Sequence, residues 1–449
     1  MRIPERPPTL LELIERPSES GNDPRRLAEI MTSQIGPAPG GKYRHWDTLR
    51  HVPPPANLTH REWWTAIKLA RSSLRRELPL RDRNGRTFGY GLPDIVLEML
   101  HAIDRDASGH LEMSDAIVNP QTRDRYVQSS LIEEAITSSQ LEGAATTREV
   151  AKEMIRSGRH PIDRSELMIL NNYRAIKLIG SFKTKPLSSE LVFAIHETLT
   201  RGSLGSSPHP RKLRAPGDGI AVYDDRDNTL LHMPPPAEEI TQRMQFMCEF
   251  ANHQPTGVFL HPVIKAIVLH FWLAYDHPFV DGNGRTARAL FYWSMLSQGF
   301  WLVEFLSISS ILRKAPGRYS RSFLYAETDE NDLTYFILHH LKVILQAIDE
   351  LRAYMVRKLT EIRETELILR SRVALNHRQL AFLSHALRHP GMRYTIESHQ
   401  RSHAVAYQTA RTDLLDLAQR GLLDQTRAGR AFAFAAPEDL RERLEALTA

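Results

Sequence analysis

Apolar residues recur every three or four positions over most of the chain, and this spacing restricts the fold to one built mainly from helices. The clearest example is RYVQSSLIEEAITSSQLEG (residues 125–143), where Gly143 stands at the position of a left-handed C-terminal cap. The same spacing predicts helices at about 63–75, 93–103, 163–181, 188–200, 237–252, 262–275, 283–298 and 333–372. The expected fold class is therefore mainly α.

Residues 205–236 break this helical spacing and are rich in turn-forming residues. Two short β-prone pieces, IAVY and TLLHM, are separated by DDRDN, which predicts a β-hairpin at about 218–234. It is the one convincing hairpin signal in the helical part of the chain. Residues 1–60 are rich in Pro, Gly and Ser and predict an extended arm that wraps another part of the protein.

The pattern changes again after residue 375. Three helical segments (376–390, 395–404 and 407–423) are followed by a β-prone piece, DQTRAGRAFAFAAP (424–437). This is the order of elements in a winged helix-turn-helix domain.

The third of these helices is the expected recognition helix. Thr409, Arg411 and Arg420 could meet DNA phosphates or base edges, whereas Asp413 and Asp416 weaken the basic face. DNA binding and a purely protein-protein role, such as dimerisation, both remain open for this domain.

The chain has 449 residues, which indicates two or three domains, here expected at 1–160, 161–372 and 375–449. A formal charge of +5 is mild for this length and does not by itself argue for a nucleic-acid partner. The single cysteine, Cys248, excludes a disulfide framework and a cysteine-based metal site. We find no signal-peptide pattern and no membrane-length apolar segment, so we expect a cytoplasmic protein with no membrane partner.

The strongest functional signal is DHPFVDGNGRTAR (residues 276–288), in which a helix, a short glycine-containing loop and a second helix follow one another. Pro278 should end the first helix by Asp276, because the residue before a proline is disfavoured in helical geometry. A loop that leads with glycines into a helix N-terminus directs unpaired N–H groups at an anion.

The side chains of this motif fit the same interpretation. Asn283 adds an amide donor, and Arg285 and Arg288 share a helical face and can hold a polyphosphate. Asp281 can recruit Mg²⁺ beside the phosphates, and His277 can take a proton near neutral pH. Any two of these features are more often an ordinary capped turn, but their combination in this order favours a functional site.

HPFVDGNGRTAR resembles the signature of the Fic family, with every fixed position filled, and the resemblance extends over about 165–345. It implies a Fic-type helical bundle with a β-hairpin flap and protein adenylyltransferase activity. His277 would be the base that deprotonates a Ser, Thr or Tyr hydroxyl, which attacks the α-phosphate of ATP. Asp281 would hold Mg²⁺ (or Mn²⁺), and Phe279 would pack the loop into the core.

By the same resemblance, Gly282, Asn283 and Gly284 would form the anion cradle, and Arg285 and Arg288 would hold the β- and γ-phosphates. Gly284 argues against phosphorylating relatives, which have lysine there, and Gly282 argues against phosphocholine transfer. Transfer of AMP is favoured, with UMP or another nucleotide left open.

SSQLEG (138–143) resembles the inhibitory motif of the family, formed here by Ser138, Glu142 and Gly143. The resemblance implies that Glu142 pairs with Arg288 in place of the γ-phosphate. A carboxylate and a phosphate would then compete for one guanidinium.

The resemblance also implies that a segment of the target protein docks on the flap, where Leu231 and His232 line the entrance, and that Tyr319 borders the adenine. Self-modification and a homodimer are open. The alternatives are a DNA-binding regulator whose Fic core senses a nucleotide, and an enzyme that removes AMP. A weaker signal, DRDASGHLEMSD (104–115), partly matches a calcium-binding loop but more often is a polar turn.

Overall fold

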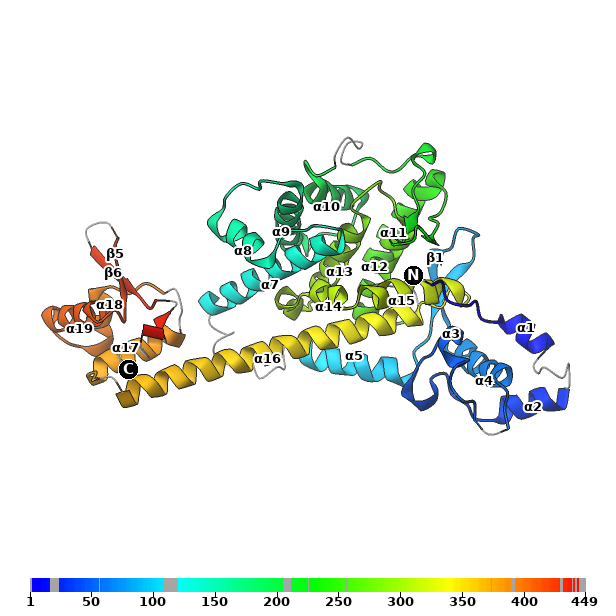
Figure 1. Ribbon diagram of the computed structural model, residues 1–449, viewed down its shortest axis with the longest axis horizontal. Helices are drawn as coiled ribbons and strands as arrows, with labels where there is room; N and C mark the ends of the chain where they lie inside the picture. The colour runs from blue at the N-terminus through cyan, green and yellow to red at the C-terminus, as the bar shows by residue number, and fades with distance from the viewer. Residues whose placement is uncertain are drawn as a thin grey trace. The chain divides into compact units, whose positions relative to one another are not determined.

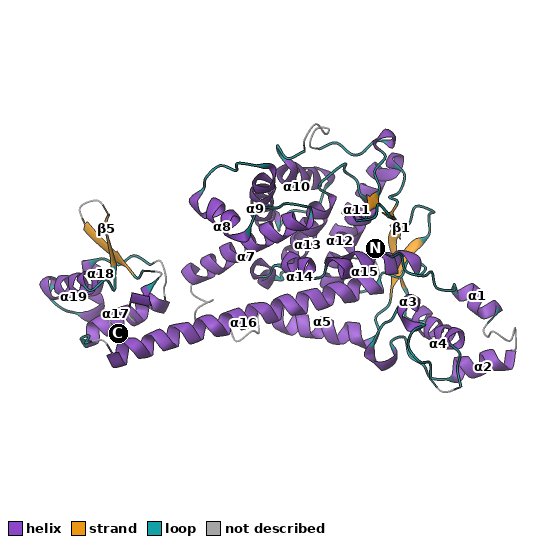
Figure 2. Ribbon diagram, viewed as in Figure 1, coloured by secondary structure: helices purple, strands orange, loops and turns teal. Residues whose placement is uncertain are grey.

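The computed structural model describes residues 2–16, 24–55, 57–107, 120–204, 211–224, 226–254, 257–372, 374–388, 392–428, 431–437, 439–440 and 442–443. The chain divides into two compact units, one of residues 1–109 and 130–348 and the other of residues 110–129 and 349–449. Helices dominate both, and the strands of the described residues form short antiparallel pairs (Figure 2). The prediction of a mainly α fold is confirmed.

Two helices form the centre of the first unit. α12 (Pro262–Asp276) and α13 (Asn283–Ser297) pack side by side, α9 (Arg164–Phe182) and α10 (Ser189–Thr200) cover α13, and α11 (Ile240–Asn252) covers α12 (Figure 1). Nearly all of both helices is buried; α12 is mostly apolar, whereas α13 also buries the polar side chains of Asn283, Arg285 and Arg288 in its first two turns.

The other elements of the first unit surround this centre. α7 (Pro120–Leu141) and α8 (Arg148–Ser157) pack on α9 through a cluster that includes Ile132, Ile136 and Met154. This unit also contains α5 (Asp94–Ala107), α14 (Ile308–Lys314), α15 (Pro316–Thr328) and the first part of the long α16 (Thr334–Arg372), whose C-terminal part belongs to the second unit. Short 3₁₀ helices lie at Pro39–Gly41, Pro216–Asp218, Ala237–Glu239 and Trp301–Phe305. Among the described helices, none has both the length and the hydropathy needed to cross a membrane.

The N-terminal region is less extended than the sequence suggested. It contains α1 (Leu10–Glu15), α2 (Pro24–Thr32), α3 (Trp46–Leu49) and α4 (His60–Ser72). The apolar side chains of Leu13, Leu49, Trp63, Trp64 and Ile67 form a small core there. The expectation of a wholly extended arm is therefore wrong, because single apolar residues between the prolines are enough to bury these short helices.

Two hairpins lie in the first unit. β3 (Val222–Tyr223) and β4 (Leu230–His232) form the predicted flap. The pair β1 (Arg76–Arg81) and β2 (Thr87–Tyr90) was not predicted. The predicted calcium loop falls mostly on residues 108–119, outside the described residues, and Oδ2 of Asp104 lies 2.9 Å from Nε2 of His261.

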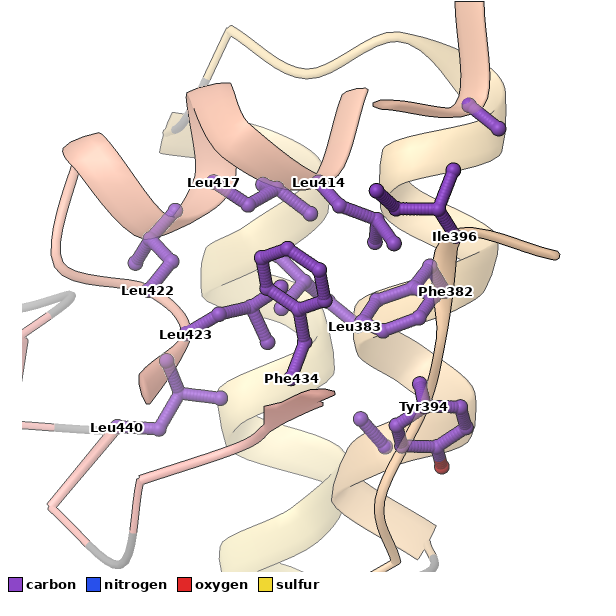
Figure 3. Packing of buried hydrophobic residues seen from close by; sticks show 12 residues of the cluster. Phe382, Leu383, Tyr394, Ile396, Leu414, Leu417, Leu422, Leu423, Phe434 and Leu440 are labelled. Atoms are coloured by element: carbon purple, nitrogen blue, oxygen red, sulfur yellow. The ribbon is translucent and has the colours of Figure 1, made fainter. Parts of the chain in front are cut away.

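The second unit contains the predicted helices and hairpin of the tail. α17 (His377–Arg388), α18 (Ile396–His403) and α19 (Tyr407–Gln419) precede β5 (Asp424–Ala428) and β6 (Ala431–Ala435). Tyr394 pairs with Phe434 of β6 in an antiparallel bridge, which adds a third extended segment to the hairpin. Phe434 lies at the centre of the apolar core, among side chains from all three helices (Figure 3).

Candidate active site

The loop between α12 and α13 carries the histidine of the motif. α12 ends at Asp276 as predicted, and His277 leaves the helix in a left-handed conformation (φ 48°, ψ 55°). Its Nδ1 lies 3.2 Å from the carbonyl oxygen of Ala274, so that the proton belongs on Nδ1 and Nε2 keeps its lone pair. Burial lowers the pKa of His277 to about 4, and the ring is neutral at physiological pH.

The rest of the loop closes on itself through Asn283. Its Oδ1 accepts from the backbone N–H of Phe279 (2.9 Å), and its Nδ2 donates to the Phe279 carbonyl (2.7 Å). The Phe279 ring is fully buried, as expected. With its side chain engaged in this way, Asn283 offers an anion its backbone N–H at the first turn of α13.

His196 of α10 contacts two residues of the loop, Phe279 and Asp281, and the sequence did not predict this role. Its ring stacks on Phe279 with centroids 3.7 Å apart, and its Nε2 lies 2.9 Å from the carbonyl oxygen of Asp281. Gly282 is left-handed (φ 84°), and a Cβ there would lie 2.8 Å from Thr200 of the same helix. α10 therefore leaves no room for a side chain at residue 282.

Arg214, which precedes β3, connects the loop to the segment after β4, and the sequence did not predict this role either. Its guanidinium donates to the carbonyls of His277 (2.8 Å), Pro235 (2.5 Å) and Asp276 (3.2 Å), while its backbone N–H donates to the Pro278 carbonyl (2.9 Å). All of these acceptors belong to the backbone. The only sequence signal is an arginine between apolar and proline residues, and that pattern does not specify its partners.

Arg288 meets the predicted inhibitory motif. Its Nε donates to Oγ of Ser138 (2.8 Å), and its Nη2 donates to the Ser138 carbonyl and to Oε1 of Glu142, both at 2.9 Å. The Arg288 side chain is 2% exposed and that of Glu142 is 26% exposed. Burial acts to raise the pKa of the Glu142 carboxyl, but Arg288 outweighs it, and the net pKa lies below the usual range.

Two glycines, one from each motif, lie beside this ion pair. Gly143 follows Glu142 with φ 89°, in the left-handed cap expected there. A Cβ on Gly284 would overlap the Glu142 carboxylate, so that Glu142 lies directly against the N-terminus of α13. The structure thus brings His277, Glu142 and Arg288 into one site from segments that are far apart in the sequence.

Two charged residues of the motif flank this centre. Arg285 is buried and donates to the Leu199 carbonyl (2.9 Å), and its Nη2 lies 3.7 Å from Oδ1 of Asp281. The Asp281 carboxylate is 36% exposed, and Arg164 approaches it at 3.5 Å. Within the described residues, no group of three His, Cys, Asp or Glu side chains could hold a metal by itself.

The flap residues lie beside a separate hollow. A cavity of about 290 Å³ is lined by Leu231, His232, Tyr275 and Glu327, among others. Both ring nitrogens of His232 are engaged, Nδ1 with Glu327 (2.8 Å) and Nε2 with the Tyr275 carbonyl (2.7 Å). The hydroxyl of Tyr319 lies 2.8 Å from Nε2 of His270.

Comparison with known proteins identifies the family of the central part of the chain. Residues 186–295 match the Fic/DOC family, and this part of the chain is a Fic domain. A protein adenylyltransferase Fic from Nematostella vectensis is 29% identical over 214 residues, which cover 45% of this chain and 45% of that protein. One of the same name from Drosophila melanogaster is 38% identical over 69 residues, which cover 15% of this chain and 14% of that protein. The chain thus matches less than half of the length of either relative.

Two solved structures share the fold. A Fic family protein from Desulfovibrio desulfuricans G20 has a TM-score of 0.52 at 18% identity, covering 78% of this chain and 98% of that one. Fic-1 from C. elegans has a TM-score of 0.50 at 18% identity, covering 78% of this chain and 89% of that one. At this identity the likeness concerns the fold, which is that of Fic-domain proteins.

Proposed function

We propose that the protein is an adenylyltransferase that moves AMP from ATP to a Ser, Thr or Tyr hydroxyl of a protein, and that Glu142 holds it in an inhibited state. The observation that carries the proposal is the position of His277, whose Nδ1 faces the Ala274 carbonyl so that Nε2 can accept a proton beside the N-terminus of α13. Its lowered pKa agrees with this role. The names of the Nematostella and Drosophila relatives support the choice of AMP as the transferred group.

The reaction follows from these positions. Nε2 of His277 takes the proton of the target hydroxyl while the hydroxyl oxygen forms a bond to the α-phosphorus of ATP. The bond from that phosphorus to the bridging oxygen breaks, and pyrophosphate leaves. The N-terminal N–H groups of α13, and the Arg288 guanidinium once Glu142 has left it, would stabilise the phosphate charge.

A metal ion fits Asp281. Its half-exposed carboxylate is a single anionic ligand, which suits Mg²⁺ because that ion usually takes one or two carboxylates together with substrate phosphates. Bound there, Mg²⁺ would neutralise phosphate charge. The target segment would dock along β4, next to the cavity that Leu231 and His232 line.

Inhibition follows from competition for Arg288. The Glu142 carboxylate accepts a hydrogen bond of 2.9 Å from Nη2 of this guanidinium, where a terminal phosphate would otherwise bind. ATP can then bind without presenting its α-phosphate for attack in line with the leaving group.

The test is the incorporation of label from ATP carrying ³²P at the α-position, read on the protein itself and checked by intact mass. We expect Glu142→Gly and Glu142→Gln to increase labelling and His277→Ala to abolish it. Glu133→Gln is the matched control, because Glu133 lies on α7, the helix that ends just before Glu142, and pairs instead with Arg148. Equal labelling of wild type and both Glu142 variants would remove the inhibitory role. A mass gain in no form, with ATP or UTP, would remove the transferase assignment for self-modification.

A further inference from the structure

The second unit presents one helix face that no part of the described chain covers. α18 and α19 are joined by a three-residue turn, Ala404–Val405–Ala406, in which Ala404 is left-handed (φ 51°). This is the geometry of a helix-turn-helix. Ala410, Asp413, Leu414 and Leu417 of α19 are buried. The opposite face carries Tyr407, Gln408, Arg411 and Thr412, which are exposed or half-buried.

The two acidic residues expected to weaken this face turn out to be engaged elsewhere. Asp413 is buried and accepts from Arg378 (2.7 Å) and Asn376 (2.8 Å). Asp416 accepts from Gln379 (2.7 Å) and Arg420 (3.0 Å). Their charges are therefore neutralised within the domain, which corrects the expectation from the sequence.

The same contacts revise the list of DNA-contacting residues. Arg420 is held by Asp416 and by the Ala374 carbonyl (2.9 Å), so it is not available as expected. The side chains of Arg393, Arg401 and Arg411 form no hydrogen bond or ion pair within the part of the chain that the structure describes. Glu397 is the exposed acid on α18, and it is outnumbered by these three arginines.

We propose that α19 enters the major groove of double-stranded DNA. Its exposed face offers the side chains that read bases there, because an arginine can bond to both acceptors of guanine and a glutamine can bond to the edge of adenine. Arg411 and Gln408 read bases, Tyr407 and Thr412 contact the strand beside them, and Arg393 and Arg401 meet phosphates. DNA is favoured over a protein partner because this face carries arginine, glutamine and threonine side chains while its two nearby acids are engaged within the domain, which suits a polyanion. This inference is independent of the proposed transferase activity.

The test selects binding sequences with the full-length protein. Duplexes with a randomised centre of about 20 base pairs, two helical turns, are captured on the protein and sequenced over successive rounds. We expect one motif to be enriched. Arg411→Ala and Gln408→Ala should each weaken binding to that motif by about 5- to 150-fold and relax the preference at one base position. Arg401→Ala should weaken binding to all DNA sequences by the same factor. It should also reduce the slope of log affinity against log salt concentration by about 1.

Arg443→Ala is the control, since this arginine of the same unit is paired with Asp424 (3.2 Å) and Asp439 (2.9 Å). It should keep the enriched motif and its affinity. Circular dichroism and thermal melting confirm that each variant is folded. Failure to enrich any motif would overturn the proposal, as would equal losses in Arg411→Ala and Arg443→Ala. A change of oligomeric state in Tyr407→Ala, with no sequence-selective DNA binding by the wild type, would make this face a protein-protein contact instead.

Discussion

Gly284 and Glu142 are fitted to each other: a Cβ atom on Gly284 would overlap the carboxylate with which Glu142 binds Arg288. Gly284→Ala should therefore force Glu142 away and destabilise the fold by about 1–3 kcal/mol, the usual range for an added methyl group in a packed site. In the Glu142→Gly background the same change should cost less than about 0.5 kcal/mol. Denaturant unfolding of the four proteins in this double-mutant cycle measures the coupling. Equal costs in both backgrounds would mean that the two residues are not in contact.

The low pKa of His277 predicts how transfer depends on pH. Because burial lowers this pKa to about 4, the ring stays deprotonated and competent as a base at every pH above that value. In the uninhibited Glu142→Gly variant, transfer measured at saturating ATP should show no loss on acidification through pH 6.5. It should fall only as the pH approaches 4. An inflection near 6.5 would mean that His277 titrates as an exposed histidine, and would contradict its buried, neutral state.

The low pKa of His277 should also make the free energy of unfolding depend on pH. Between pH 6.5 and about 4 the unfolded chain protonates His277 while the folded chain does not, so that the free energy of unfolding falls as the pH falls through this window. The contribution of this residue amounts to as much as about 3 kcal/mol. His277→Ala should therefore lose less stability than wild type between pH 7 and pH 4, as measured by urea unfolding. Parallel losses would contradict the assignment.

Much of the fold could be predicted because its helices are long and their apolar spacing is regular. α12 and α13 were placed within a residue of their observed bounds, and the αL cap at Gly143 follows from the glycine itself. The pair β1–β2 was missed because RELPLR is too charged to show strand alternation. Asn84-Gly85, a turn signal at its tip, was the usable clue. The short N-terminal helices depend on tertiary burial, which local sequence does not reveal.

Some residues of the site could be predicted from the sequence and others could not. His277 and Arg288 are recognisable because their motif is contiguous, and Glu142 because its own motif accompanies it. His196 and Arg214 act on backbone carbonyls of the loop, and such partners leave no pattern of residue types in the sequence. The engagement of Asp413 and Asp416 within the tail likewise depends on α17 packing against α19.

Removing the hydrogen bonds that Arg214 donates to backbone carbonyls should loosen the loop that carries His277. Arg214→Met keeps the apolar stem but leaves buried carbonyls of Asp276 and Pro235 without a donor, at a cost of about 1–3 kcal/mol each. We expect a lower unfolding midpoint, and in the Glu142→Gly background at least a tenfold loss of transfer, since a small displacement of His277 is costly. Arg201→Met is the control, because this arginine after α10 is 68% exposed and lies 3.9 Å from a partly exposed Glu197, so that its loss should matter by less than about 0.5 kcal/mol. Unchanged transfer in a destabilised Arg214→Met would limit this arginine to a structural role.

His196 should act on the reaction by positioning Asp281. His196→Phe keeps a ring to stack on Phe279 but removes the hydrogen bond to the Asp281 carbonyl, so that the carboxylate next to it is held less firmly. In the Glu142→Gly background, transfer should then need a higher Mg²⁺ concentration for half-maximal rate, while the KM for ATP at saturating Mg²⁺ stays near its original value. His253→Phe, at an exposed histidine after α11, controls for the substitution itself. A fall in rate with an unaltered Mg²⁺ requirement would show that His196 supports the fold of the loop without orienting the metal ligand.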